Sequence, residues 1–594
     1  MDPRSEYLTR LDRWSHDRDA LEQRFVRIGN WRLALGILEA VLAALAFGAH
    51  LIASWLLLLP FVAFVTLVIW HQRIIRRRTF AARAIRFYDA GLARLDDHWI
   101  GTGNSGDRYR DPAHVYAEDF DLFGKGSLFE LITAARTAAG ENTLASWLLA
   151  PAERDQALAR QQAVRELETR LDLREDIALL GEDVRAEVHT ESLHKWGSAP
   201  AVHFAPLLRP LALLLAIAGV ATLLAFLATA LPLWPFLAIL GCDFLLIFAL
   251  RQRVAQALES AGTSAQGLHI LSLLLERLER ESFEAPQLRQ LRSVLEVQNV
   301  PASARIARLR KWIEWLDSSD HLLVRVIRPV LLLQEQIAIG IEQWRRENGS
   351  RIGAWVSAVA EFEALSSLAS LAFERPTWTF PALIADAGPR FEAEALQHPL
   401  MASARCVPND VALGDGLRLL IVSGSNMSGK STLLRAVGLN AVLAWAGAPV
   451  AARSLRISSL QPGASIRVTD SLHDNRSRFF AEISRIRQIV GLANGSRPVL
   501  FLLDELLSGT NSHDRRIGAA GIVRKLVHSG AIGLITTHDL ALAAIEQDLA
   551  PAVENVHFDD QIIDGRIEFD YRLRPGVVTH SNALELMRSV GLEV

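Results

Sequence analysis

Residues 422–432 read Val-Ser-Gly-Ser-Asn-Met-Ser-Gly-Lys-Ser-Thr. The spacing Gly-x-x-x-x-Gly-Lys-Ser inside this stretch is typical of a loop whose backbone N–H groups surround phosphates. An apolar run at 419–422 precedes the loop, and an apolar helical pattern at 433–443 follows it. Because such a loop requires a strand before it and a helix after it, the stretch predicts a nucleotide-binding α/β domain.

Each residue type in the loop has a physical role. Lys430 can reach the β- and γ-phosphates of ATP, and the Ser431 hydroxyl can ligate Mg²⁺. The helix that begins near Ser431 adds the positive end of its dipole. We expect the nucleotide to contact Gly424, Ser425, Asn426, Met427, Ser428, Gly429, Lys430, Ser431 and Thr432.

Two later apolar runs end in polar residues. The run at 498–503 ends in Asp504-Glu505, as expected for a buried parallel strand that delivers carboxylates at its carboxyl end. Asp504 can hold the Mg²⁺ shell, and Glu505 can orient or deprotonate the attacking water. The run at 532–535 leads to His538, which can sense or polarise the γ-phosphate. The predicted catalytic residues are Glu505 and His538, and the predicted metal ligands are Ser431 and Asp504.

The composition limits the class of protein. A length of 594 residues predicts several domains, and the net charge of −3 gives no basic excess that would indicate nucleic acid, although a local patch stays open. The two cysteines, Cys242 and Cys406, lie far apart, which argues against a disulfide framework or a cysteine zinc site and fits a reducing compartment. Residues 1–27 are charged and have no apolar core, so they are not a signal peptide.

Two apolar blocks predict membrane helices. Residues 33–70 are interrupted near 50–54, and residues 211–250 are interrupted at 232–235. Each half is close to the ~20 residues that span a bilayer as a helix. Each block therefore predicts a helical hairpin, and the two blocks together predict four transmembrane helices.

Charge predicts how these hairpins lie in the membrane. The short hairpin loops contain no Lys or Arg, whereas the bases of the hairpins carry Arg24, Arg27, Arg32, Arg73, Arg76, Arg77, Arg78, Arg209, Arg251 and Arg253. The positive-inside rule then places the rest of the chain in the cytoplasm of a bacterium-like cell. The alternative is a set of buried helices in a soluble core, which Glu39 and Asp243 inside the spans favour slightly. If both carboxylates do lie in the bilayer, they should face other helices or a polar cavity.

The rest of the chain is mostly helical before residue 375. The stretch Gly101 to Gly106 matches Gly-x-Gly-x-x-Gly, but it follows no strand and opens no helix, so we expect an ordinary turn. Leucines at 268, 271, 274 and 275 predict a buried helix face. The predicted architecture is an α-helical region with four transmembrane helices, followed by an α/β P-loop domain. The expected domain ranges are 1–120, 121–375 and 376–594.

The loop Asn426–Thr432 resembles the Asn-Met-x-Gly-Lys-Ser-Thr loop of MutS-type mismatch repair ATPases. The similarity is specific over about 375–594 and looser over about 120–375. The segment Ser477-x-Phe479-x-x-Glu482 resembles the counterpart of the ABC signature. The other matching stretches are 140–147, Pro151, 160–167, 374–376, 397–400, 407–410, 504–505, 509–510, 536–538, 571–576 and 583–592.

The resemblance implies an ABC-type ATPase that works as a homodimer. Each ATP and its Mg²⁺ would lie between the phosphate loop of one subunit and Ser477 of the other, and helices at 120–375 would act as a lever that carries the closing motion. Two departures stand out. The first 120 residues contain no Phe-x-Glu wedge of the kind that stacks on a mispaired base, and the second hairpin is inserted where the family places its DNA clamp.

Three functions therefore remain open. The first is a membrane-anchored MutS-type ATPase that drives a conformational change. The second is a membrane-tethered protein of DNA mismatch repair or recombination that binds duplex DNA. The third is an ABC-like transporter, although the motif variants resemble MutS more than transporters.

Overall fold

The computed structural model divides the chain into two compact units. The first contains residues 1–108, 123–131 and 373–376, and the second contains 109–122, 132–372 and 377–594. The described residues are 2–48, 51, 53–187, 190–228, 230–318, 322–385, 388–425, 427–467, 478–507, 510–538, 543–563 and 566–578.

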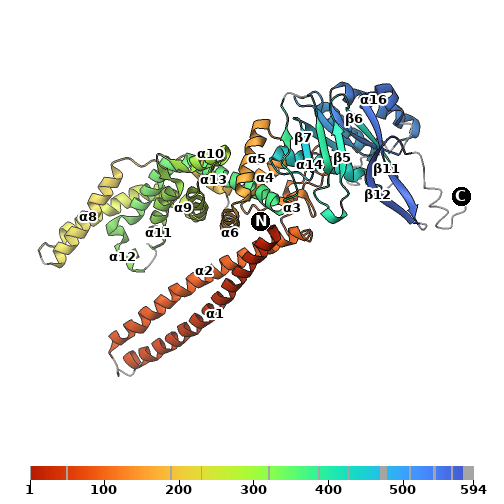
Figure 1. The fold of residues 1–594 in the computed structure, drawn as a ribbon. Helices are drawn as coiled ribbons and strands as arrows, with labels where there is room; N and C mark the ends of the chain where they lie inside the picture. Colours follow the sequence, from red (N-terminus) through yellow and green to blue (C-terminus); the bar gives the residue numbers. More distant parts are fainter. Residues whose placement is uncertain are drawn as a thin grey trace. The chain divides into compact units, whose positions relative to one another are not determined.

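The first unit is built around a long helical hairpin. Helix α1 (Pro3–Ala43) continues into the π-helical turn η1 (Ala44–Gly48), and the short helix η2 (Ser54–Leu57) leads into α2 (Leu58–Leu95). Figure 1 shows the two helices side by side, as the interruption near 50–54 predicts. The Asp2 side chain caps α1 by accepting a hydrogen bond from the N–H of Ser5 at 2.9 Å.

The base of this hairpin is tied by buried polar contacts. The Tyr7 ring contacts the Tyr88 ring at 5.4 Å between centroids, and the Tyr7 hydroxyl donates to Glu374 at 3.1 Å. Arg94 forms a bidentate ion pair with Glu374, with Nε 2.7 Å from Oε2 and Nη2 2.6 Å from Oε1. The stretch at 101–106 forms turns, so that prediction is confirmed.

Helices make up the first half of the second unit. They are α4 (Ala138–Leu149), α5 (Arg154–Glu168), α6 (Leu171–Glu187), α7 (Thr190–Ser198), α8 (Leu208–Leu227), α9 (Trp234–Glu279), α10 (Pro286–Leu295), α11 (Ala302–Ser318), α12 (Leu322–Leu331) and α13 (Leu333–Glu374). A two-stranded ribbon of β1 (Glu296–Val297) and β2 (Val300–Pro301) separates α10 from α11. The predicted leucine face on α9 is buried, and α8 with the start of α9 forms the predicted second hairpin.

Helix α13 is held at two distant points by buried carboxylates. Near its carboxyl end, Glu363 accepts hydrogen bonds from the N–H groups of Arg136 and Thr137, at 3.0 and 3.1 Å, at the start of α4. Near its amino end, Glu342 accepts from the N–H of Val202 at 2.8 Å, in the segment that leads into α8. Both carboxylates are almost fully buried, so leaving either one unpaired would be costly.

Five helices among the described residues are long and apolar enough to cross a membrane. The most apolar windows of the helices at 3–48, 55–95, 208–227 and 234–259 are only 6–17% buried. The corresponding window of α13 is 78% buried, and the α13 side chains Trp355 and Phe362 are fully buried. Burial therefore separates α13, a core helix, from the four helices that the sequence predicts to be membrane spans.

The second half of this unit is a mixed α/β domain with a six-stranded sheet in the order β12-β11-β6-β10-β9-β8. All neighbours are parallel except β11 and β12. The strands are β6 (Leu419–Ser423), β8 (Gln461–Ser465), β9 (Val499–Leu503), β10 (Ile532–Thr537), β11 (Val553–Ile563) and β12 (Arg566–Pro575). A smaller sheet has the order β3-β7-β4-β5, with strands β3 (Ala382–Leu383), β4 (Phe391–Leu396), β5 (Asn409–Leu413) and β7 (Ser454–Ile457).

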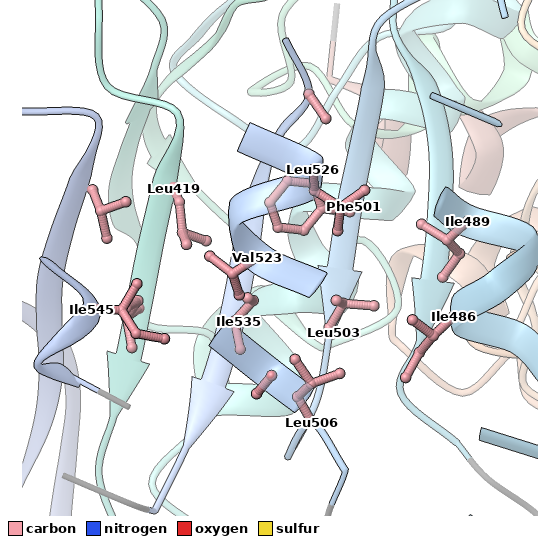
Figure 2. Packing of buried hydrophobic residues seen from close by; sticks show 14 of the residues in the cluster. Leu419, Ile486, Ile489, Phe501, Leu503, Leu506, Val523, Leu526, Ile535 and Ile545 are labelled. Carbon is pink, nitrogen blue, oxygen red and sulfur yellow. The ribbon is translucent and has the colours of Figure 1, made fainter. Parts of the chain in front are cut away.

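Both faces of the central strands are covered. The domain's main helices are α14 (Lys430–Ala446), α15 (Arg478–Leu492), α16 (Ser512–His528) and α18 (Ile545–Leu549). Figure 2 shows one buried cluster, with side chains of α15 and α16 against those of the strands: Leu419, Ile486, Ile489, Phe501, Leu503, Val523, Leu526 and Ile535. Leu500 and Leu502, which alternate with Phe501 along β9, are equally buried. This two-sided burial explains why the strands appear in the sequence as unbroken apolar runs.

Candidate functional site

The predicted site residues meet at one edge of the large sheet. Strand β10 lies between β6 and β9, and the pairs Thr537 with Ser423 and Ile535 with Leu503 bring the three carboxyl ends level. The phosphate loop follows β6, Asp504 and Glu505 follow β9, and His538 follows β10. Ligands bind at such carboxyl edges in open α/β sheets.

The loop has the backbone that its glycines predict. Gly424 has φ +148°, and Gly429, the residue before α14, has φ +102°. A Cβ atom on Gly424 would lie 2.9 Å from the Ser428 hydroxyl and 3.0 Å from the Phe558 carbonyl oxygen. Glycine is therefore required there both for conformation and for space. Met427 is exposed and has φ +69°, while Asn426 lies outside the described residues.

Lys430 is buried in the site. Its Nζ donates to the carbonyl oxygens of Gly424 at 2.9 Å and Ser425 at 2.7 Å, and it lies 3.3 Å from His538 Nε2. Burial lowers the pKa of the Lys430 ammonium group, and the carboxylates of Asp504 and Glu505 oppose that shift. The side chain is thus held at the centre of the loop and the carboxylates.

Ser431 and Asp504 form the pair expected at a magnesium site. The Ser431 hydroxyl donates to one Asp504 carboxylate oxygen at 2.5 Å, and the Thr536 hydroxyl donates to the other. A carboxylate and a hydroxyl next to a phosphate loop are the oxygen ligands that Mg²⁺ accepts together with substrate phosphates. The described residues contain no cluster of three or more His, Cys, Asp or Glu side chains suited to a metal.

Glu505 and His538 also lie together. The His538 ring nitrogen Nε2 is 2.9 Å from Glu505 Oε1, and both side chains are partly exposed at the site. Glu505 has φ +45°, an uncommon conformation for a residue with a side chain, and its N–H donates to the Thr536 hydroxyl at 2.9 Å. Strained backbone of this kind occurs where the surrounding structure fixes a functional side chain.

Two contributors were not predicted as site residues. The fully buried Thr536 hydroxyl joins Asp504 to the Glu505 backbone, and the sequence indicates it only as part of the resembling stretch 536–538. Glu482 is also buried, and its carboxylate accepts the N–H of Leu507 at 2.6 Å, which connects α15 to the turn after Glu505. The sequence indicates Glu482 only through the resemblance of its segment to the counterpart of the ABC signature. Ser477, predicted to act from the partner subunit, lies outside the described residues.

A pocket of about 680 Å³ opens beside the loop. The loop and α14 form one side of it, and His398, Val407, Asn409, Phe558 and Tyr571 contribute to the other. Burial lowers the pKa of His398 to about 4, so its ring is neutral near pH 7. The volume lies within the range of small-molecule sites, and a nucleoside would find apolar and aromatic surface there next to the phosphate loop.

Asn409 holds two walls of this pocket together. Its side chain donates to the Tyr571 carbonyl oxygen at 2.9 Å and accepts the N–H of Leu573 at 2.7 Å. These hydrogen bonds join β12 to the start of β5. The stretches 397–400 and 407–410, which the sequence singled out only by resemblance, thus belong to the site.

Comparison with known proteins identifies the domain. The family model for MutS domain V matches residues 420–593. The DNA mismatch repair protein MutS 2 of Halobacterium salinarum is 32% identical over 276 residues, which is 46% of this chain and 31% of that protein. The Endonuclease MutS2 of Thermomicrobium roseum is 32% identical over 250 residues, 40% of this chain and 31% of that protein. The chain therefore spans about a third of the length of these curated relatives. The likeness to MutS proteins is therefore shown for the C-terminal part of the chain, where residues 420–593 match MutS domain V.

Proposed function

We propose that this protein is a membrane-anchored MutS-type ATPase, which hydrolyses ATP at a homodimer interface and uses the cycle to move its helical and membrane parts. One observation carries the proposal. Residues that follow three separate strand ends form two contacting groups there. His538 contacts both Lys430 and Glu505, and Ser431 donates to Asp504. Such a grouping beside a phosphate loop suits phosphoryl transfer to water.

Each side chain has a role in this reaction. Lys430 binds the β- and γ-phosphate oxygens when it leaves the loop carbonyls, and the loop N–H groups hold the same phosphates. Ser431 and Asp504 would hold Mg²⁺, which would supply positive charge to the phosphate oxygens when bound. Glu505 orients the attacking water and accepts its proton, and His538 holds the Glu505 carboxylate and contacts the γ-phosphate.

The homodimer completes the site in this proposal. Ser477 of one subunit would contact the γ-phosphate bound by the other, so ATP would join the subunits and hydrolysis would release them. Glu482 supports this arrangement, because its hydrogen bond to Leu507 joins the helix that follows Ser477 to the turn that follows Glu505. Closure at the signature segment would therefore change the position of the Glu505 carboxylate in the same subunit.

The membrane anchor consists of the two hairpins. Their apolar windows leave large side chains exposed, including Leu33, Trp55, Leu59, Leu214 and Phe244. A hydrocarbon environment would cover this surface, since exposed apolar area on this scale is costly in water. The proposed location is the inner or plasma membrane, with the ATPase domain in the cytoplasm.

Binding of duplex DNA is the second candidate function. Its support is the names of the relatives, one a mismatch repair protein and the other an endonuclease. Binding that weakens steeply with salt would favour this candidate, because phosphate contacts release counterions. A solute that stimulates ATP hydrolysis in proteoliposomes would instead favour the transporter.

Two variants test the ATPase. Lys430→Ala should abolish nucleotide binding or turnover, and unchanged hydrolysis would reject the site. Glu505→Gln should bind ATP, lower turnover by roughly 10²- to 10⁴-fold and accumulate as a closed dimer. Size-exclusion chromatography with ATP measures that dimer, and a monomeric Glu505→Gln protein with bound ATP would contradict the composite site. A carbonate wash tests membrane anchoring separately. We expect the protein to stay in the membrane fraction after the wash.

A further inference from the structure

The first hairpin carries an unusual groove at its charged end. The groove lies between α1 and α2, has a volume of about 510 Å³, and is lined by Leu21, Arg24, Arg27, Ile28, Trp70, Arg73, Ile74 and Arg77. We call this set the arginine groove. Its four arginines stand over a floor of aliphatic and aromatic side chains, and it contains no acidic residue.

The helical spacing places these arginines on facing surfaces. Arg24 and Arg27 are three residues apart on α1, and Arg73 and Arg77 are four residues apart on α2. Positions three and four apart lie on one side of a helix, so each helix contributes one edge of the groove. All four side chains are exposed. A second pocket of about 530 Å³ shares Arg24 and Arg77, and it adds Arg76 but also Asp17.

The charges of the groove are not balanced within the described part of the hairpin. No ion pair or hydrogen bond joins the side chains of Arg24, Arg27, Arg73 or Arg77 to an acidic residue there. The neighbouring Arg78 behaves differently, since it pairs with Glu22 at 2.8 Å. Four arginines that line one groove and are bonded to no described carboxylate repel one another, and an anion in the groove would relieve that repulsion.

The arginines at the base of the second hairpin serve as an internal comparison. Arg209 donates to Gln343 at 2.8 Å, and Arg253 donates to the His203 carbonyl oxygen at 3.4 Å. Both are therefore engaged with the protein itself. Arg251, the third arginine at that base, lies over the Phe248 ring. The first hairpin differs in that four arginines without a bonded carboxylate among the described residues line one groove.

The depth of the groove suggests which anion it receives. Arg73 lies three residues and Arg27 six residues beyond the predicted span at 33–70, which corresponds to about 5–9 Å along a helix. The headgroup layer beside the hydrocarbon core is roughly 5–7 Å thick, so Arg73 lies within it. Arg27 lies just beyond its outer edge, and its long side chain can extend back to the lipid phosphates. The apolar floor, with exposed Trp70, continues directly toward the span.

We propose that the arginine groove binds the headgroup of an anionic phospholipid, with its phosphate among the four arginines and an acyl chain along the apolar floor. Arginine suits this ligand because its planar fork can make two hydrogen bonds to one phosphate. The positive charge would also attract a nucleic acid. A nucleic acid, however, has no acyl chain that could bury the apolar floor leading into the membrane span. The inference rests on the membrane anchoring proposed above.

The test uses the full chain reconstituted in vesicles of phosphatidylcholine with phosphatidylglycerol. Electron paramagnetic resonance of spin-labelled lipids measures how strongly each lipid associates with the protein. We expect a preference for phosphatidylglycerol of roughly fivefold or more, which falls at high salt. Arg27→Gln with Arg73→Gln should reduce the preference to near onefold. Lysine at both positions should restore part of it, because the charge returns without the fork.

The matched control removes the same charge from the second hairpin. Arg209→Gln with Arg253→Gln should keep the preference of the wild type, and an equal loss in both variants would overturn the groove as a specific site. Retention of the preference in Arg27→Gln with Arg73→Gln would also overturn it. If that variant instead loses binding of duplex DNA, the groove serves nucleic acid. A carbonate wash of each preparation separates this inference from its foundation, because release of the wild type would reject membrane anchoring itself.

Discussion

Thr536 gives the sharpest test of the site, because one hydroxyl holds both the Asp504 carboxylate and the backbone of Glu505. Its oxygen donates to Asp504 and accepts the N–H of Glu505 at 2.9 Å, and the side chain is fully buried. Thr536→Val keeps the shape and removes both hydrogen bonds. A hydrogen bond to a charged group contributes about 1.5–3 kcal/mol, and a buried N–H left without a partner costs about 1–3 kcal/mol.

The effect on activity follows from these values. If the transition state loses about 3 kcal/mol of stabilisation, turnover falls roughly 100-fold. The assay is steady-state ATP hydrolysis by the detergent-purified chain, with thermal unfolding measured on the same samples to detect a general loss of folding. Thr536→Ser is the control, since it retains the hydroxyl and should stay within a few-fold of the wild type. A Thr536→Val enzyme as active as Thr536→Ser would refute the positioning role.

Three further predictions concern stability. Gly438→Ala should lower the free energy of unfolding by about 1–3 kcal/mol, because the added Cβ would meet the buried Phe120 ring at 2.2 Å; an unchanged melting temperature would contradict this contact. Glu482→Leu should destabilise the domain by about 1–3 kcal/mol and slow hydrolysis, since the N–H of Leu507 loses its acceptor, whereas Glu482→Gln should retain both properties. For His398, the pKa in the folded protein is about 4 against an ordinary 6.5, so below pH 6.5 the unfolded chain binds a proton that the folded chain excludes. Stability should therefore fall between pH 6.5 and 4 by up to about 3 kcal/mol, and His398→Asn should melt with a smaller pH dependence; equal slopes would exclude His398 as the cause.

The strands of the large sheet could be predicted from the sequence because both of their faces are buried. The runs at 419–422, 498–503 and 532–535 correspond to β6, β9 and β10, and each ends beside the polar residues that were expected there. The break between the helices of each hairpin was also predicted, since prolines and polar residues interrupt the apolar blocks. These signals are local, and local periodicity is what a single sequence displays best.

The second wall of the pocket beside the phosphate loop could not be predicted in the same way. Asn409 and Tyr571 lie 162 positions apart, and their hydrogen bond depends on the pairing of β12 with β11, which no local pattern specifies. Thr536 is equally inconspicuous, because threonine is common in strands and its hydroxyl matters only once β9 is its neighbour. The arginine groove likewise requires α1 and α2 to be side by side before its four charges form one surface.

Two of the buried carboxylates on α13 have a mechanical consequence. Glu342 and Glu363 are 21 positions apart in one continuous helix, so their attachment points are separated by about 31 Å at 1.5 Å per residue. If the contact with α4 turns by about 5° when nucleotide binds, the segment before α8 shifts by about 3 Å, provided that the helix stays straight. That shift is comparable to the length of a hydrogen bond. A small rotation at the α4 contact would thus suffice to exchange one set of polar contacts for another beside the second hairpin.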